Sequence, residues 1–246
     1  MKPILNISAY LFTSLNDTLA LRESIRSQAA AASLRGTVLI AEEGINLFLA
    51  GDAGALRGFV AWLQCDARFA ALEPKESWSD SPPFRKLLVK VKREIIRMNH
   101  PAIRPAAGRA PAVDARTLSR WLAAGRDDDG VPVVTLDTRN AFEVEHGRFR
   151  GAIDWKLGKF SDFPQALQAH REQLAGKTVV SYCTGGIRCE KAALLMAEAG
   201  IERVLQLEGG ILKYFEQAGG AHFDGDCFVF DGREVLDASL APAGTA

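Results

Sequence analysis

A single cysteine in a glycine-rich segment carries the strongest chemical signal in the sequence. Cys183 follows a run of strand-forming residues and precedes two glycines, Arg188 and a helical pattern that begins at Glu190. Glycines let the backbone N–H groups of such a loop turn inward, and the helix start and the arginine add positive charge. These features favour a thiolate. We therefore predict a nucleophilic sulfur in an anion-binding loop formed by Thr184, Gly185, Gly186, Ile187 and Arg188.

The spacing within this loop separates the chemistries that such a cysteine can perform. Four residues lie between Cys183 and Arg188, which is a shorter spacing than in cysteine phosphatases. The smaller ring fits a persulfide sulfur better than a phosphoryl group, and this disfavours a phosphatase. The alternative without chemistry is a buried thiol that precedes an ordinary glycine turn. Because a nucleophile must meet its substrate, we expect Cys183 to be open to solvent.

The other three cysteines are weaker candidates for chemistry. Cys189 lies six residues after Cys183, where it can either resolve an oxidised Cys183 as a disulfide or pack the helix onto the sheet, and the sequence favours neither. We expect Cys65 to be inert and Cys227, in an apolar stretch, to be a packing residue. The four cysteines are too few for a disulfide scaffold in a chain of this length. They form no C-x-x-C pair, which argues against a structural zinc site.

Two pairs of charged residues precede the cysteine loop. Asp137 and Arg139 follow a strand of the buried type, where charges are tolerated only when they are hydrogen-bonded, so we favour a structural role. Glu143 and His146 can act as acid and base near the site, but we favour a solvated pair at a helix start.

The densest positive region of the chain lies before residue 105. It includes Lys86, Lys90, Lys92 and Arg93, of which the lysines share one face of an alternating strand. Such a run is either a solvated surface or a face that contacts the phosphates of a nucleic acid. RNA contact is the hypothesis that the family resemblance below favours.

The elements that position these residues alternate between strands and helices. The first hundred residues predict the order β-α-β-β-α-β of a ferredoxin-like α+β domain. Its strands are expected over Ile4 to Phe12, Thr37 to Ala41, Asn46 to Ala50 and Leu87 to Ile95, and its helices over Asp17 to Leu34 and Ala53 to Cys65. Later strands at Val131 to Asp137, Lys177 to Tyr182 and Arg203 to Leu207, with a helix over Glu190 to Ala199, predict an α/β domain with a parallel sheet covered by helices.

A shift in composition separates the two domains. Residues 98–113 are rich in Pro, Ala, Gly and Arg and read as a linker. We therefore expect an N-terminal domain over 1–97, a second domain over 114–222 and a C-terminal tail over 223–246.

Composition excludes several classes of protein. The 246 residues carry 30 Lys and Arg against 30 Asp and Glu, which argues against a generally polycationic nucleic-acid binder. The chain has no apolar run long enough for a membrane span and no signal-peptide pattern, so we expect a cytoplasmic protein. No cofactor is identifiable, because Gly209-Gly210 lacks the spacing of a dinucleotide fingerprint and no His and carboxylate cluster indicates a metal.

Five ordered segments together resemble the family of oxygen-dependent tRNA uridine(34) hydroxylases, which contain a rhodanese domain. They are GTVLIAEEGIN from Gly36, the basic strand ending in KREI, CTGGIRCEK from Cys183, EGGILKY from Glu208 and CFVFD from Cys227. The resemblance implies an acylphosphatase-like domain followed by a rhodanese-like parallel sheet with helices on both faces. It also implies conversion of the wobble uridine of tRNA to 5-hydroxyuridine, with contacts to the anticodon region, dioxygen as co-substrate and Cys183 as the essential sulfur.

Two other functions remain open at this point. A rhodanese-type sulfurtransferase that moves sulfane sulfur through a Cys183 persulfide needs only the loop, but it leaves the N-terminal half unexplained. A binding module whose loop captures an anion without catalysis is the third hypothesis.

Overall fold

The computed structural model describes residues 3–243 of the chain. Two compact units are present: Met1–Arg97 with Asp231–Arg233, and Met98–Phe230 with Glu234–Ala246. Residues 1–2 and 244–246, which the predicted first domain and the predicted tail include, lie outside the described residues.

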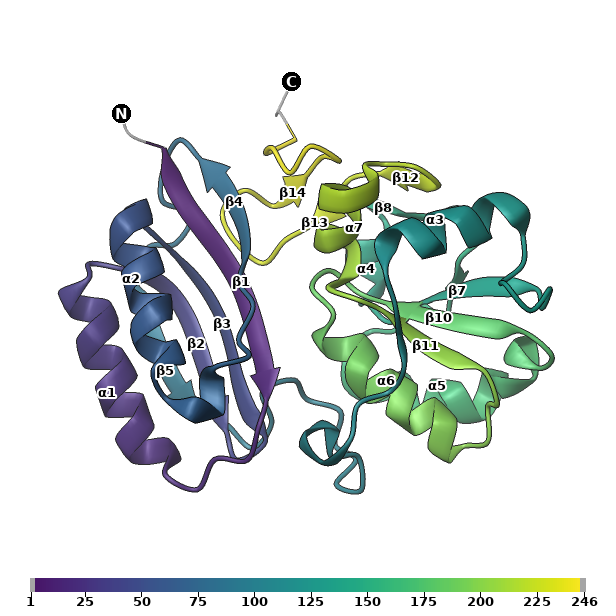
Figure 1. The fold of residues 1–246 in the computed structure, drawn as a ribbon, viewed down its shortest axis with the longest axis horizontal. Coiled ribbons are helices and arrows are strands. Elements are labelled where there is room, and N and C mark those ends of the chain that lie inside the picture. The colour runs from purple at the N-terminus through teal and green to yellow at the C-terminus, as the bar shows by residue number, and fades with distance from the viewer. Residues whose placement is uncertain (1–2, 244–246) are drawn as a thin grey trace. The chain divides into compact units, whose positions relative to one another are not determined.

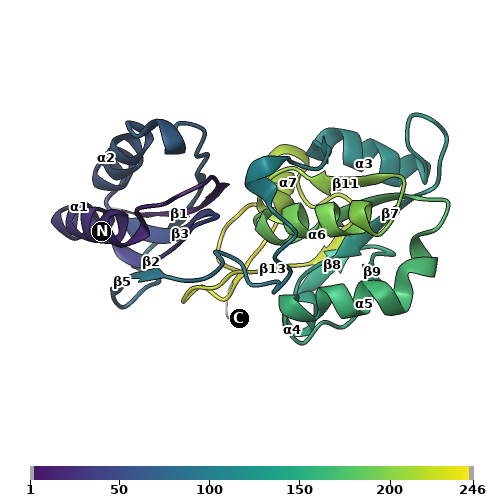
Figure 2. The ribbon, with the colours of Figure 1, turned by 90° about the horizontal axis from the view of Figure 1, so that it is seen from below.

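The first unit is a five-stranded sheet with two helices on one face (Figures 1 and 2). Its strand order is β4-β1-β3-β2-β5. Apolar residues of α1 and α2, such as Ile25 and Phe59, pack on the sheet and form the core. The carboxylate of Asp52 accepts hydrogen bonds from Gly54 N and Ala55 N and so begins α2. The elements are β1 (Ile4–Phe12), α1 (Thr18–Ala31), β2 (Arg35–Ala41), β3 (Gly44–Gly51), α2 (Ala53–Gln64), β4 (Lys75–Ser79) and β5 (Leu87–Val91).

The strand that completes the β-α-β-β-α-β order is β4 and not the predicted strand from Leu87. Strand β4, which the sequence did not predict, pairs antiparallel with β1 and completes the ferredoxin-like unit. Its sequence KESWS is mostly polar and half-buried at an edge, so it carries no apolar alternation. The predicted strand from Leu87 exists as β5, shorter than expected, and lies parallel to β2 at the opposite edge. Leu87 and Val89 pack against the core.

The second unit is built on a parallel sheet of order β6-β11-β10-β7-β9. Helices α3 and α7 lie on one side of this sheet, and α5 and α6 lie on the other (Figure 1). Helices on both faces of a parallel sheet confirm the predicted fold class. The elements are β6 (Ala112–Val113), α3 (Ala115–Ala124), β7 (Val133–Asp137), α4 (Ala141–Val144), β8 (Gly147–Phe149), β9 (Ile153–Asp154), α5 (Phe163–His170), β10 (Thr178–Tyr182), α6 (Ile187–Glu198), β11 (Val204–Leu207) and α7 (Gly210–Ala218).

The predicted linker and the predicted C-terminal tail both form part of the folded units. Residues 98–113, the predicted linker, group with the second unit, and their last two form β6 beside β11. In the tail, β12 (Phe223–Gly225) pairs with β8, and β13 (Cys227–Phe228) pairs with β14 (Val235–Leu236). These strands are only two or three residues long, which is too short for a sequence pattern to reveal.

A short part of the tail belongs to the first unit. Arg233 Nη1 donates to Ser77 Oγ at 2.7 Å, and Gly232 N donates to Pro83 O at 3.0 Å. Within residues 3–243, no helix has the length and apolar character needed to cross a membrane.

Candidate active site

Two neighbouring parallel strands bring the predicted site residues to one edge of the second sheet. Tyr182 at the end of β10 is in register with Asp137 at the end of β7. Thr138 donates from both its backbone N and its Oγ1 to Tyr182 O, at 3.0 and 2.9 Å. Cys183 follows directly and therefore lies at the carboxyl edge of the sheet, where parallel α/β folds bind their ligands.

The loop after Cys183 directs hydrogen-bond donors at its sulfur. Gly186 N donates to Cys183 Sγ at 3.1 Å, and the Arg188 guanidinium lies close enough for its positive charge to act on this sulfur. Gly186 has a φ of 103°, a conformation that favours glycine, and it directly precedes α6. The amino end of α6 therefore adds its partial positive charge.

These contacts decide the ionisation of Cys183. Burial alone raises the pKa of the Cys183 thiol, because a charged sulfur is poorly solvated in the interior. A hydrogen bond from Cys189, the charge of Arg188 and the backbone N–H groups of Cys189 and Arg188 outweigh burial and hold the pKa well below its usual value. The geometry thus agrees with a thiolate at Cys183.

The pKa values of the other two buried cysteines are shifted in the opposite direction. Burial, followed by the hydrogen bond to Cys183, raises the pKa of Cys189 well above its usual value. Its Sγ also lies 2.9 Å from Gly186 O. Burial raises the pKa of Cys227 to about 12. All four cysteines are free thiols, and only Cys65 is exposed.

The expectation that Cys183 is open to solvent is wrong for this structure. Cys183 has 0% of its surface exposed. Its loop is covered by other parts of the unit: Ile211 N donates to Cys183 O at 2.9 Å, and the ring of Phe230 lies 5.9 Å from Arg188 Cζ. The sequence could not show this, because the covering residues come from segments that follow the loop by more than twenty positions.

Glu143 is a site residue whose contact the sequence analysis missed. It is fully buried and accepts from Arg188 Nη1 at 2.6 Å and from Arg188 Nη2 at 2.7 Å. The expectation of a solvated pair is therefore wrong for Glu143, while His146 is exposed. The only signal in the sequence is local: Glu143 follows Asn140 by three residues and accepts from Asn140 N at 3.0 Å, as in a helix capping box.

Asp137 and Arg139 support the segment that holds Glu143. Both are buried, and the Arg139 guanidinium donates to both oxygens of Asp137. Its remaining N–H groups donate to Gly147 O at 2.6 Å and Glu143 O at 3.4 Å. These contacts connect the end of β7 with α4 and β8, in agreement with the structural role that we favoured.

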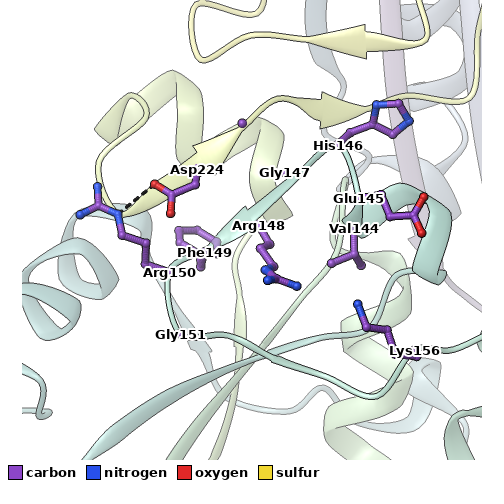
Figure 3. Close-up of a pocket in the computed structure, with 11 residues that line it drawn as sticks. Val144, Glu145, His146, Gly147, Arg148, Phe149, Arg150, Gly151, Lys156 and Asp224 are labelled. Atoms are coloured by element: carbon purple, nitrogen blue, oxygen red, sulfur yellow. Dashed lines mark hydrogen bonds and ion pairs between the residues drawn. The ribbon is translucent and has the colours of Figure 1, made fainter.

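A pocket of about 480 Å³ lies beside the same α4–β8 segment (Figure 3). It is lined by Val144 to Gly151, Lys156, Asp224 and Gly225 and contains none of the Cys183 loop residues. Figure 3 shows Arg148 and Lys156 extending toward one another, whereas Arg150 pairs with Asp224 at 3.0 Å. Both Arg148 and Lys156 are paired with the carboxylate of Asp154, at 3.8 and 2.7 Å.

The basic residues singled out from the sequence lie in the first unit. Lys86, Lys90, Lys92 and Arg93 are on or beside edge strand β5, and all four are exposed. Among the described residues, no group of three or more His, Cys, Asp or Glu is arranged to hold a metal ion.

Comparison with known proteins identifies the family. The chain is 66% identical over 241 residues to the tRNA uridine(34) hydroxylase of Variovorax paradoxus, covering 98% of this chain and 92% of that protein. It is 67% identical over 242 residues to the protein of the same name from Bordetella pertussis, covering 98% and 99%. The chain belongs to the tRNA uridine(34) hydroxylase family.

Domain comparisons agree with this membership. Residues 4–95 match the model described as UPF0176 acylphosphatase like domain, and residues 118–217 match the rhodanese-like domain. These matches confirm the resemblance to the hydroxylase family and its two expected domains. A solution NMR structure of a rhodanese-like domain from Anabaena sp. is 22% identical with a TM-score of 0.39, covering 55% of this chain and 87% of that one.

Proposed function

We propose that this chain hydroxylates C5 of the wobble uridine of tRNA, position 34, to give 5-hydroxyuridine with dioxygen as co-substrate. The observation that carries the proposal is the similarity, along nearly the whole chain, to proteins named for this activity. The class of enzyme is then an oxidoreductase, its partner is the anticodon region of tRNA, and its compartment is the cytoplasm.

In this proposal Cys183 is the catalytic residue. Its thiolate, or the corresponding persulfide, adds to C6 of uracil and makes C5 nucleophilic. C5 then attacks dioxygen and forms a hydroperoxide. Loss of the C5 proton and expulsion of the sulfur restore the C5–C6 double bond. The released Cys183 thiolate removes the outer oxygen of the hydroperoxide as a sulfenic acid and leaves 5-hydroxyuridine. The lowered pKa of Cys183 supports this role, because the thiolate is the nucleophilic form.

Cys189 offers a source for the electrons that this reaction consumes. Insertion of one oxygen atom from dioxygen into the C5–H bond also forms one water and uses two electrons and two protons. The Cys189 thiol then converts the Cys183 sulfenic acid into a disulfide with release of one water, so the two thiols together supply these two electrons and two protons. Cys183 and Cys189 lie close enough for each thiol to shift the pKa of the other, which supports a role for Cys189 as the resolving thiol. A thiol reductant then restores the dithiol.

The buried position of Cys183 adds a requirement to the mechanism. Because no part of Cys183 is exposed, uracil reaches its sulfur only after a neighbouring side chain moves. Phe230 packs over Arg188 and belongs to the tail, so this ring can move without breaking a strand of the parallel sheet.

Replacement of Cys183 by serine tests the proposal. Nucleoside mass spectrometry of tRNA from cells that lack the native gene should show 5-hydroxyuridine with the wild-type protein and none with Cys183→Ser. With purified wild-type protein and no added reductant, 5-hydroxyuridine and the Cys183–Cys189 disulfide should accumulate in equal amounts.

The same samples distinguish the alternative function. Unchanged 5-hydroxyuridine in the Cys183→Ser strain would reject Cys183 as the catalytic residue. Thiosulfate:cyanide turnover by the wild-type protein, with no effect of gene loss on tRNA, would instead identify a sulfurtransferase.

A further inference from the structure

Three aromatic side chains form a partly exposed cluster next to the cysteine loop. Phe142, from α4, has 43% of its surface exposed, and Phe230, which follows β13, has 50% exposed. Phe228 lies between them, with ring centroids 5.2 Å from each. All three ring pairs are nearly perpendicular, at 85–87°, so none of the rings is stacked in parallel on another. We call Phe142, Phe228 and Phe230 the aromatic cluster.

The aromatic cluster contacts the loop that carries the catalytic sulfur. The ring of Phe230 lies 5.9 Å from Arg188 Cζ, and the charge of Arg188 acts on Cys183. Thr184 Oγ1 donates to Phe228 O at 3.4 Å. A ligand on these rings is therefore separated from the sulfur by one side chain.

A pocket with two exposed cations adjoins the same cluster through His146. The ring of His146 packs against Phe228 at 5.4 Å, and His146 also lines the pocket that contains Arg148 and Lys156 (Figure 3). These two cations share one carboxylate, Asp154, and are 51% and 64% exposed. An RNA whose bases stack on the rings can therefore place a phosphate beside Arg148 and Lys156.

We propose that the aromatic cluster is a stacking surface for an unpaired nucleobase of the substrate RNA. This inference rests on the proposed function and adds the residues that bind the target base before it reaches Cys183. Proteins that read single-stranded RNA stack unpaired bases on aromatic side chains, and anticodon loops present such bases. The exposed rings, their contact with Arg188 and the neighbouring cations favour a nucleobase over an apolar protein segment. Phe142 and Phe230 are the ring faces that the base contacts.

Binding of matched RNAs tests this inference. The probes are an anticodon stem-loop with uridine at position 34 and the same stem-loop with an abasic nucleotide there, titrated against the full chain. Wild-type protein should bind the uridine RNA at least about fivefold more tightly than the abasic RNA, as expected for one stacked base. Phe142→Leu, which keeps an apolar side chain but removes the ring, should reduce this ratio toward one. Phe142→Tyr should restore it.

Controls separate stacking from other effects. Trp78→Leu removes a ring of similar exposure (42%) from the first unit and should leave the ratio unchanged. The ring that packs on Arg188 is that of Phe230, so the pH profile of Cys183 alkylation should be the same in Phe142→Leu as in the wild type.

Three results would overturn the inference. The first is an unchanged ratio in Phe142→Leu while the wild type still produces 5-hydroxyuridine, in which case the proposed function stands and the stacking surface does not. The second is a ratio of one in the wild type. The third is a wild-type dimer that becomes monomeric in Phe142→Leu with the same RNA ratio, which would assign the cluster to a second copy of the chain. Failure of the wild type to bind or hydroxylate either RNA would instead reject the proposed function itself.

Discussion

Cys183 and Cys227 show, at the scale of single residues, what the loop contributes beyond burial. Both are completely buried in the second unit. The pKa of Cys227 rises to about 12, mainly through burial, whereas that of Cys183 falls well below its usual value although burial acts on it in the same direction. The difference comes from the N–H, guanidinium and thiol donors around Cys183. The loop therefore creates the thiolate, and an apolar interior alone would suppress it.

Replacing Cys189 should move the titration of Cys183. Cys189→Ala removes the hydrogen bond that contributes most to lowering the pKa of Cys183, so this pKa rises. At a pH just below the usual range of thiols, the Cys183 thiolate fraction then falls and alkylation slows. Cys189→Ser, which keeps a donor, should retain most of the wild-type profile. The measurement is the rate of iodoacetamide labelling of the Cys183 peptide against pH, and identical profiles in all three proteins would contradict the assigned hydrogen bond.

Glu143 should be important for stability because its partner is buried. Glu143→Gln leaves the Arg188 guanidinium in the interior without its carboxylate, and removing one member of a buried pair costs about 3–5 kcal/mol. The exposed pair Arg150–Asp224 is a matched control, because Arg150→Ala should cost less than about 1 kcal/mol. Urea unfolding of both variants measures the free energies. Similar small losses would mean that Glu143 does not hold Arg188.

At the scale of elements, the first residues of α7 donate hydrogen bonds to carbonyl oxygens of the cysteine loop. Ile211 N donates to Cys183 O, and Leu212 N donates to Thr184 O at 3.1 Å. This close approach requires a glycine at 210, where φ is 68° and an added Cβ would lie 2.4 Å from Cys183 O. The segment EGGILKY is therefore part of the site even though none of its side chains reacts.

Gly210→Ala tests this contact between elements. The new Cβ would clash with Cys183 O, and alanine is strained in the left-handed conformation of position 210. Together these effects should destabilise the chain by about 1–3 kcal/mol and shift the Cys183 alkylation profile toward that of an ordinary thiol. Gly58→Ala, inside α2 with nothing within 4 Å of the added Cβ, should instead stabilise by about 0.5–1 kcal/mol. Thermal unfolding with alkylation measures both. A stable Gly210→Ala with an unchanged profile would show that α7 does not shape the loop.

At the scale of the whole molecule, charge is balanced overall and concentrated locally. The chain carries no net charge, yet four cations accompany edge strand β5. An edge strand leaves its outer side unpaired, and lysines there also oppose unwanted strand pairing. The RNA contact of Lys86, Lys90, Lys92 and Arg93 and the domain boundaries at residues 97 and 113 stay predictions.

The salt dependence of RNA binding tests the basic face. In the triple variant Lys86→Ala, Lys90→Ala, Lys92→Ala, affinity should fall uniformly across RNA sequences. The slope of log affinity against log salt should decrease by about 0.7–0.9 for each phosphate that the variant no longer neutralises. A matched triple variant at Arg26, Arg57 and Arg116, exposed cations on three helices, should keep the wild-type slope. Equal slopes in both variants would remove the basic face from the RNA interface.

Features that depend on residues close together in the sequence could be predicted from it. The spacing of Cys183, two glycines and Arg188 predicted a loop that surrounds this sulfur with donors, although the helix begins at Ile187 and includes Arg188. Apolar periodicity predicted most long elements and the parallel sheet. Both are encoded over a few consecutive positions, which fix the backbone N–H directions and the face of a helix or strand.

The residues that surround the loop became known only from the folded chain. Glu143 reaches Arg188 across 45 positions, and Phe228 reaches Thr184 across 44, because adjacent parallel strands and a returning tail bring their ends together. The same packing buries Cys183 and places β4 and β6 at sheet edges. Such contacts depend on which strands become neighbours, and this is set by the burial of the whole core, which no single stretch of sequence encodes.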